Sequence, residues 1–328
     1  MKQSHTDPLL SCTDLSIVFN THEGCFSAVR HVDFEIGHGE IVGLVGESGC
    51  GKSLTALSIM GLLPETASAH GNAIHFEGKD LLNINERAYQ QIRGNRISMI
   101  FQEPMTSLNP VFKVGFQVRE ALLLHQKIDK TEAQTQAISM LKDVGIPAPE
   151  QAYNAYPHEL SGGMRQRVMI AMAMCCNPKL LIADEPTTAL DVTIQAQIIE
   201  LIKGLVCTRN MSVLFITHDL GVVAEICDRV IVMYAGNILE EGSVENILEH
   251  PLHPYTQGLL KAIPQIDNQL DYLHIIPGSV PALKDLKDMT GCCFEPRCTN
   301  AMDICRQEIP GAHTPRDNHH VNCHLYNR

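Results

Sequence analysis

The chain lacks an apolar run that is long enough to span a membrane as a helix. Its longest uninterrupted apolar segment, residues 168–176, has nine residues, about half of what a membrane helix needs. The first residues, MKQSHTDPLLSCTD, also lack the charged and then apolar pattern of a signal peptide. We therefore expect a chain that does not cross a bilayer by itself and that works in the reducing cytosol.

The chain has fewer basic than acidic residues. Lysine and arginine number 25 against 37 aspartates and glutamates, so the formal net charge is −12. General binders of nucleic acid or of anionic lipid are usually basic. This balance argues against both classes of partner, and we expect no nucleic-acid partner, although a local basic patch is compatible with it.

Disulfides are not expected, although the chain has twelve cysteines. Because a reducing compartment keeps thiols free, the cysteines are interpreted as core fillers, metal ligands or both. Four of them crowd into the fifteen residues 291–305, GCCFEPRCTNAMDIC, and a fifth, Cys323, follows near the end.

Short apolar strands alternate with helical stretches, which is typical of a layered α/β domain. Buried strands are predicted in residues 40–46, 180–186, 212–217 and 229–236, and residues 191–206 have helical spacing of apolar residues. A helix-rich insertion is predicted at about residues 103–164. From residue 251 the proline, glycine and cysteine content rises. We therefore predict a main domain over 1–250 and a small C-terminal extension over 251–328.

The segment GESGCGKS, residues 46–53, fits the pattern of a phosphate-binding loop between a strand and a helix. Glycines let backbone N–H groups close around phosphate oxygens, and the helix N-terminus adds a favourable dipole. Lys52 is predicted to reach the β- and γ-phosphates, and the Ser53 hydroxyl to ligate Mg²⁺.

A second acidic element follows another predicted strand. In LLIADEP, residues 180–186, Asp184 and Glu185 stand at the carboxyl end of the strand, where open α/β sheets bind ligands. Asp184 is expected to hold Mg²⁺ through water. Glu185 is expected to orient the attacking water or accept its proton.

Two further segments carry a family resemblance. LSGGMRQR, residues 160–167, resembles the signature motif of ABC-transporter ATPases, and ITHDL, residues 216–220, resembles their switch-histidine segment. The order of the elements also matches: Lys52, Gln102, the signature, Asp184–Glu185, TALD (188–191) and His218. The resemblance covers essentially the whole chain. It implies an α/β fold of the P-loop NTPase (RecA-like) type, an ABC ATPase core with an inserted helical subdomain and a small cysteine-rich extension.

The resemblance also implies a shared site. In this family two chains enclose two ATP molecules, each between one chain's phosphate loop and the other chain's signature helix. Glu185, His218 and Gln102 would be catalytic, and Ser53, Gln102 and Asp184 would hold Mg²⁺. Phe19 is the candidate for stacking on adenine, with a core phenylalanine as the alternative. The implied ATP contacts are Phe19, Gly46, Glu47, Ser48, Gly49, Cys50, Gly51, Lys52, Ser53, Leu54, Gln102, Ser161, Gly162, Gly163 and Asp191.

The segments 101–110, 183–199 and 253–264 are similar to the ATP-binding subunits of bacterial dipeptide and oligopeptide importers. This implies a peripheral protein on the cytoplasmic side of the inner membrane. The implied partners are a related second ATPase subunit in a heterodimer, two membrane permease subunits and an extracytoplasmic peptide-binding protein. Residues 104–112 are expected to dock on the permeases. Other cargoes (nickel, antimicrobial peptides or glutathione) and a soluble ABC-type ATPase of nucleic-acid metabolism are the alternatives.

Cys50 is a candidate reactive thiol. It lies inside the phosphate loop, where a helix N-terminus can lower a thiol pKa. We expect alkylation of Cys50 to inhibit ATP hydrolysis; the alternative is that the cysteine simply replaces a serine.

The tail resembles the importers' extension, which implies a [4Fe–4S] cluster on Cys292, Cys298, Cys305 and Cys323. Arg297 and Arg306 would offset its charge. Zinc, with His313 or His324, and no metal are the alternatives, and a metal would hold together a segment with little core.

Overall fold

The computed structural model describes residues 7–102, 107–188, 190–263, 275–287 and 289–327. The chain forms two compact units. Unit 1 comprises residues 1–9, 36–40 and 83–216, and unit 2 comprises residues 10–35, 41–82 and 217–328. The start of the predicted helical insertion, residues 103–106, and Ala189 of the TALD segment lie outside the described residues. Within the described ranges, no helix is both long and apolar enough to cross a membrane.

Unit 1 contains parallel strands, as the apolar runs predict. β7 (Ile97–Ile100) pairs with β8 (Leu180–Asp184), and β8 pairs with β9 (Ser212–Thr217), both in parallel. All residues of the three strands are buried. A parallel strand covered on both faces carries a continuous apolar run rather than an alternating one, which is what LLIAD and SVLFIT show.

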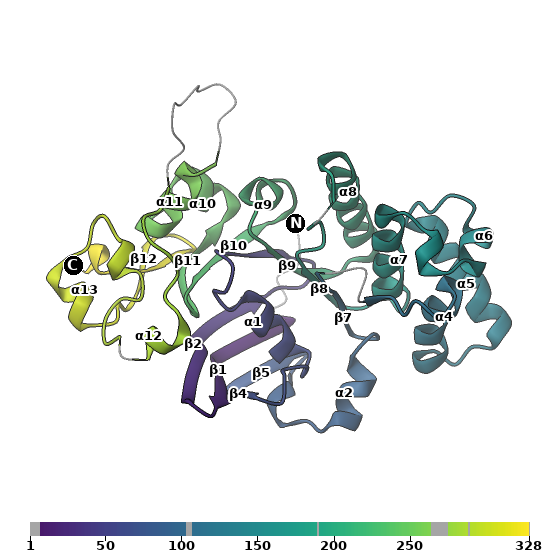
Figure 1. The fold of residues 1–328 in the computed structure, drawn as a ribbon, viewed down its shortest axis with the longest axis horizontal. Helices are drawn as coiled ribbons and strands as arrows, with labels where there is room; N and C mark the ends of the chain where they lie inside the picture. Colours follow the sequence, from purple (N-terminus) through teal and green to yellow (C-terminus); the bar gives the residue numbers. More distant parts are fainter. Residues whose placement is uncertain (1–6, 103–106, 189, 264–274, 288, 328) are drawn as a thin grey trace. The chain divides into compact units, whose positions relative to one another are not determined.

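The remaining elements of unit 1 are mainly helical. They are α2 (Glu86–Ile92), α4 (Val114–His125), α5 (Lys130–Asp143), α6 (Pro149–Asn154), the 3₁₀ helix η2 (Pro157–Glu159), α7 (Gly162–Met174) and α8 (Val192–Arg209). Figure 1 shows α4, α5 and α6 gathered beside α7. Gly115 lets α4 approach α6 closely, since a Cβ there would lie 2.1 Å from the Tyr153 ring.

Unit 2 begins with an antiparallel sheet. Its strand order is β2-β1-β5-β6, with β4 also on β1; the strands are β1 (Leu10–Thr21), β2 (Gly24–Ile36), β4 (Ala67–His70), β5 (Ala73–Phe76) and β6 (Lys79–Asp80), and the 3₁₀ helix η1 (Leu81–Asn83) follows. Along the second half of β2 buried and exposed residues alternate, as expected for a sheet with one packed face.

A second group of strands in unit 2 carries the phosphate loop. β3 (Ile41–Val45) pairs in parallel with β10 (Arg229–Tyr234), which pairs with β11 (Asn237–Ser243) in antiparallel fashion. The helices are α1 (Lys52–Ile59), α9 (Leu220–Ile226), α10 (Val244–Glu249) and α11 (Pro254–Lys261).

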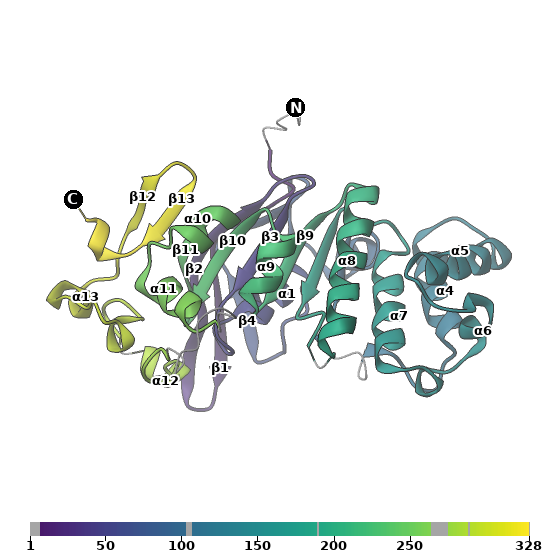
Figure 2. The same cartoon turned by 90° about the horizontal axis from the view of Figure 1, so that it is seen from above.

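The tail of unit 2 has regular structure and a core. It contains α12 (Leu283–Leu286), η3 (Glu295–Arg297), α13 (Asp303–Gln307), β12 (Ala312–Arg316), β13 (His319–Asn322) and η4 (His324–Tyr326). Figure 2 shows the β12–β13 hairpin, and β13 pairs with β11. Phe294 packs against Tyr234 and Tyr255, with ring centroids 5.2 and 5.3 Å apart. Each such aromatic pair contributes about 0.5–1.5 kcal/mol beyond the burial of its area.

Candidate nucleotide-binding site

The loop after β3 has a backbone that only glycines adopt easily. Gly46, Gly49 and Gly51 have φ values of 151°, 80° and 106°. A Cβ on Gly46 would lie 2.0 Å from the Met233 carbonyl oxygen, so that position tolerates no side chain, whereas a Cβ on Gly49 would meet nothing within 4 Å. The loop is therefore packed against β10 on one side and open on the other. An open, glycine-rich turn that leads into a helix N-terminus fits a phosphate group.

Lys52 lies inside this loop. Its side chain is buried, and Nζ donates hydrogen bonds to the carbonyl oxygens of Gly46 at 2.8 Å and Glu47 at 3.0 Å. The chain thus curls around the ammonium group and holds it at the first residue of α1. Among the residues that the structure describes, Lys52 has no carboxylate partner, so its ammonium group is available to an anion and the residues present fit a triphosphate.

Cys50 does not have the environment that the sequence led us to expect. Its side chain is fully buried. Burial raises the pKa of the thiol, and this outweighs the opposite effect of Lys52. A protonated, inaccessible thiol reacts slowly, so the interpretation as a small residue that replaces serine is favoured over that of a reactive thiol.

Glu47 connects the loop to the tail, a contact that the sequence analysis missed. Arg297 is buried and donates from Nη1 to Glu47 Oε2 at 2.6 Å and from Nη2 to Glu47 Oε1 at 3.0 Å. The backbone N–H of Glu47 donates to Tyr255 Oη at 3.0 Å. The Glu47 hydrogen bonds are the largest cause of the raised pKa of Arg297. No sequence signal pairs residues 250 positions apart; only the arginine in the tail pattern hinted at a role.

The other predicted residues of unit 2 lie on the surface or near it. Ser48 and Ser53 are exposed, and Leu54 is half-buried in the first turn of α1. Phe19, on β1, is half-buried rather than part of the closed core. His218 is exposed between β9 and α9, and the next residue, Asp219, caps α9 by accepting a hydrogen bond from Gly221 N at 2.8 Å.

Unit 1 holds the predicted acidic element and Gln102. Asp184 is buried at the carboxyl end of β8. Glu185 has a positive φ of 46°, and its Oε2 accepts hydrogen bonds from Gln102 Nε2 at 3.0 Å and Thr188 Oγ1 at 2.9 Å. Two donors on one oxygen fix the direction of the carboxylate. A residue with left-handed φ that is not glycine stores strain, and such strain is typical of functional sites.

The signature helix α7 begins at Gly162, inside the LSGGMRQR segment. Ser161 is its N-cap, and Ser161 Oγ accepts a hydrogen bond from Met164 N at 3.3 Å. A Cβ on Gly162 would meet nothing within 4 Å, so this end of the helix is open. Farther along, the buried Gln166 side chain donates from Nε2 to the Pro186 carbonyl oxygen. Gln166 therefore ties the signature helix to the turn that carries Glu185, and the sequence analysis did not single it out.

Gly163 and Asp191 have local structural contacts. A Cβ on Gly163 would lie 3.2 Å from Ile194 Cγ2, so α7 and α8 approach closely there. Asp191 is the N-cap of α8, and its Oδ1 accepts from Ile194 N at 3.0 Å. An aspartate at this position stabilises a helix by about 1 kcal/mol.

The prediction of a [4Fe–4S] cluster is wrong. Within the described ranges, no group of three or more His, Cys, Asp or Glu side chains could hold a metal ion. Cys292, Cys298, Cys305 and Cys323 are free thiols, and burial is the largest cause that raises the pKa of Cys292, to about 11. Cys298, Cys305 and Cys323 lie close enough to Cys292 to raise its pKa further, yet Cys292, Cys298 and Cys305 pack with the core around Phe294. The tail therefore has the core that a metal was expected to replace.

The roles predicted for the two arginines and the histidines of the tail are not supported either. Arg297 pairs with Glu47, and Arg306 Nε donates to Glu295 Oε1 at 2.8 Å, so both have carboxylate partners. For zinc there is no support either. His324 Nε2 is 2.9 Å from the Glu308 carbonyl oxygen and its Nδ1 is 3.0 Å from the Asn327 amide, while His313 belongs to no metal-holding group in the described part of the chain.

The fold, the glycine loop around Lys52 and the signature helix α7 define a P-loop ATPase of the ABC class. The family described as ABC transporter matches residues 29–188, and the family described as oligopeptide/dipeptide transporter, C-terminal region, matches residues 239–305. The chain is 53% identical over 319 residues to the oligopeptide transport ATP-binding protein AppD of Bacillus subtilis, covering 97% of both chains. It is 48% identical to the dipeptide transport ATP-binding protein DppD of Escherichia coli, covering 96% of both. The chain therefore belongs to the ABC transporter ATP-binding proteins of the oligopeptide/dipeptide type.

Solved structures support the fold. The dimeric ATP-binding cassette MJ0796 in a post-hydrolysis state with ADP and Pi has a TM-score of 0.65 and 26% identity, covering 72% of this chain and 98% of that one. CbiO1 of Clostridium perfringens, part of the ABC transporter complex cbiONQ, has a TM-score of 0.63 and 26% identity, covering 74% of this chain and 92% of that one. The α/β ABC ATPase fold predicted from the motifs is confirmed, and it implies binding of ATP and Mg²⁺.

Proposed function

We propose that this chain is the ATP-hydrolysing subunit of an importer that takes up dipeptides and oligopeptides across the cytoplasmic membrane. The observation that carries the proposal is the open glycine loop wrapped around Lys52, whose Nζ is held by two loop carbonyls. Relatives about 50% identical over nearly the full length are oligopeptide and dipeptide transport ATP-binding proteins, which supports the cargo class.

The site residues are proposed from the motifs and supported by local geometry. Lys52 and the loop N–H groups would bind the phosphates, and Ser161, Gly162 and Gly163 would face the γ-phosphate of a second chain. Glu185, oriented by Gln102 and Thr188, would accept a proton from the attacking water. His218 would contact the γ-phosphate, Asp191 would connect the two sites, and Phe19 would stack on adenine. These assignments remain predictions.

Ser53, Asp184 and Gln102 are proposed to hold Mg²⁺. Ser53 offers an exposed hydroxyl in the first turn of α1, and Asp184 offers a carboxylate at a strand end. Oxygen ligands of this kind suit magnesium. The ion would neutralise charge on the β- and γ-phosphates when bound.

The partners are proposed from the family. We infer a heterodimer with a related ATPase subunit, two membrane permeases and an extracytoplasmic peptide-binding protein, with this chain peripheral on the cytoplasmic side. The structure describes residues 107–112 of the predicted docking region 104–112, and an apolar surface there supports docking. Val111 and Phe112 are 70% and 45% exposed, and the ring of Phe112 stacks on that of the exposed Phe116 with 5.0 Å between the centroids. Exposed apolar side chains that lie together mark interaction sites. The domain limits 1–250 and 251–328, with the helical subdomain at about 103–164, are likewise proposed.

Peptide uptake tests the proposal. Cells that depend on this chain should take up a labelled dipeptide with wild-type protein and with Glu200→Gln, an exposed control on α8, but not with Glu185→Gln. Uptake of the dipeptide that is undiminished by Glu185→Gln, or uptake that does not depend on the chain, would contradict the proposed role.

A further inference from the structure

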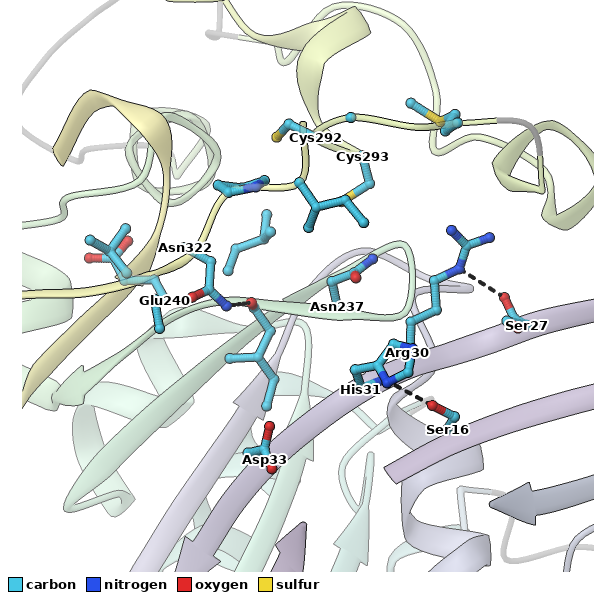
Figure 3. A pocket seen from close by; sticks show the side chains of 18 of the residues that line it. Ser16, Ser27, Arg30, His31, Asp33, Asn237, Glu240, Cys292, Cys293 and Asn322 are labelled. Atoms are coloured by element: carbon cyan, nitrogen blue, oxygen red, sulfur yellow. Dashed lines mark hydrogen bonds between the residues drawn. The ribbon is translucent and has the colours of Figure 1, made fainter. Parts of the chain in front are cut away.

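Unit 2 contains a cavity away from the phosphate loop. Its volume is about 670 Å³, within the range of about 300–1,000 Å³ that is usual for small-molecule sites. Its lining comes from three parts of the unit: β1 and β2, β11, and the tail. Figure 3 shows Arg30 and His31 on β2, Cys292 and Cys293 on the tail segment above them, and Asn237 between the two pairs in this view.

Arg30 is a cation whose charge is not matched inside this cavity. The residue is half-buried, and Nε donates to the Ser27 carbonyl oxygen at 3.4 Å, a long bond. Among the residues that the structure describes, Arg30 forms no ion pair. Burial lowers the pKa of the guanidinium, while the Cys293 thiol raises it. The terminal guanidinium nitrogens are therefore available, and the charge stands in a place where it is poorly solvated.

Two of the three carboxylates in the cavity lining are engaged by other residues. Glu240 is buried and accepts from Leu252 N at 2.7 Å and His253 N at 2.9 Å, and its Oε1 is 2.7 Å from His319 Nε2. Glu241 pairs with Arg229. Asp33 Oδ1 accepts from Asp14 N at 2.8 Å, and no residue in the described ranges bonds to Oδ2, which is therefore available to a ligand. Two cations, Arg30 and the exposed Lys287, therefore face carboxylates of which two are already engaged.

The rest of the lining suits a peptide. Asn322 donates from Nδ2 to the Ile238 carbonyl oxygen at 2.6 Å, so its Oδ1 remains to accept an N–H. Leu239, Met289 and Val321 supply apolar wall. A carboxylate anchor, an amide acceptor, a carboxylate for an ammonium group and apolar surface are the groups that a zwitterionic peptide needs.

We propose that this cavity binds a short peptide, with the C-terminal carboxylate of the peptide on Arg30. A planar guanidinium accepts a carboxylate through two parallel hydrogen bonds, a stronger and more specific contact than a lysine makes. Asp33 would receive the peptide's ammonium group. This inference rests on the proposed function for its ligand class, because the peptide would be the cargo of the same importer, and it assigns the ATPase chain a cargo site of its own.

Calorimetric titration of the full chain with trialanine tests the proposal. Binding should be measurable, and trialanine C-terminal amide, which lacks the carboxylate, should bind at least tenfold more weakly. Arg30→Met should cause a similar loss, whereas Lys79→Met, which removes an exposed cation on β6 outside the cavity, should leave affinity unchanged. Ala312→Trp, at an exposed lining position, should block binding and keeps the test valid if Arg30→Met fails to fold.

Three results would overturn the proposal: no binding of trialanine to the wild type, equal affinity for the amide, or tighter binding of inorganic phosphate than of trialanine. ATP turnover measured on the same samples separates the two claims. If the wild-type protein does not hydrolyse ATP, the result counts against the proposed function. If it hydrolyses ATP normally but does not bind trialanine, the result counts against this site alone.

Discussion

Arg297 in the tail holds Glu47 of the phosphate loop by a two-point ion pair, with Nη1–Oε2 and Nη2–Oε1 distances of 2.6 and 3.0 Å. The arginine is buried, and its Nε also donates to the Pro277 carbonyl oxygen at 2.8 Å. The tail is thus a direct neighbour of the nucleotide site within unit 2. Its aromatic core around Phe294 positions the arginine, and the arginine positions the loop.

Arg297→Met should weaken ATP binding more than it slows turnover of bound ATP. If the pair contributes about 1 kcal/mol to holding the loop, KM for ATP rises about fivefold. Arg306→Met breaks the Arg306–Glu295 pair in the same tail and should leave KM unchanged. Steady-state kinetics of the three proteins decide the matter; equal KM values would show that the loop does not depend on the tail.

Gln166→Leu should destabilise unit 1. The substitution removes the donor to the Pro186 carbonyl and places an apolar side chain in a buried polar position, a loss of about 1–3 kcal/mol in the free energy of unfolding. Urea unfolding measures it. Gln134→Leu, on the exposed face of α5, is the control and should change little. A smaller loss for Gln166→Leu than for the control would argue against the contact.

Cys50 should be among the last thiols to react. Its burial and raised pKa keep it protonated, whereas Cys25 and Cys207 are exposed. Mass spectrometry after a brief treatment of the native protein with iodoacetamide should find the label on Cys25 and Cys207 and not on Cys50. Rapid labelling of Cys50, slowed by ATP, would instead restore the expectation of a reactive thiol drawn from the helix dipole.

Acid should destabilise the region around His253. Burial lowers the pKa of this histidine to about 3, and its Nδ1 accepts a hydrogen bond from Tyr255 N. The unfolded chain takes up a proton below a pKa of about 6.5 and the folded chain does not, so stability is complete above that pH and is lost as pH falls.

The slope is at most about 1.4 kcal/mol per pH unit between pH 6.5 and 3. His253→Asn keeps an N-cap acceptor for α11 and should reduce the pH dependence between pH 7 and 5.5, as measured by urea unfolding at both values. An unchanged pH dependence in the variant would assign the acid sensitivity to other groups.

Local patterns were sufficient to predict the ATPase motifs of this chain. The apolar run before Asp184, the glycines around Lys52 and the serine that caps α7 each determine their own strand, turn or helix start, so their structure could be predicted from a few residues. The Gln102–Glu185 contact joins residues 83 apart, and only the family motif order suggested it.

The tail could not be predicted in this way. Its core depends on Tyr234, Tyr255 and Phe294, which meet from three separate segments and leave no periodic signal. The resemblance of the tail to the importers' extension therefore implied a metal cluster on its cysteines, with Arg297 offsetting the charge of the cluster. The structure instead places Cys292 and Cys305 in the core cluster that contains Phe294, with Cys298 packed against it, and it places the arginine on Glu47.

The most direct test of the central claim is ATP turnover by the purified importer with Glu185→Gln in this chain. Labelled ATP should still bind, because Lys52 and the glycine loop are unchanged. Phosphate release at this site should fall at least about a hundredfold, because the oriented carboxylate that takes the proton is gone. Phosphate release at the wild-type rate, or loss of ATP binding in the variant, would contradict the role proposed for Glu185.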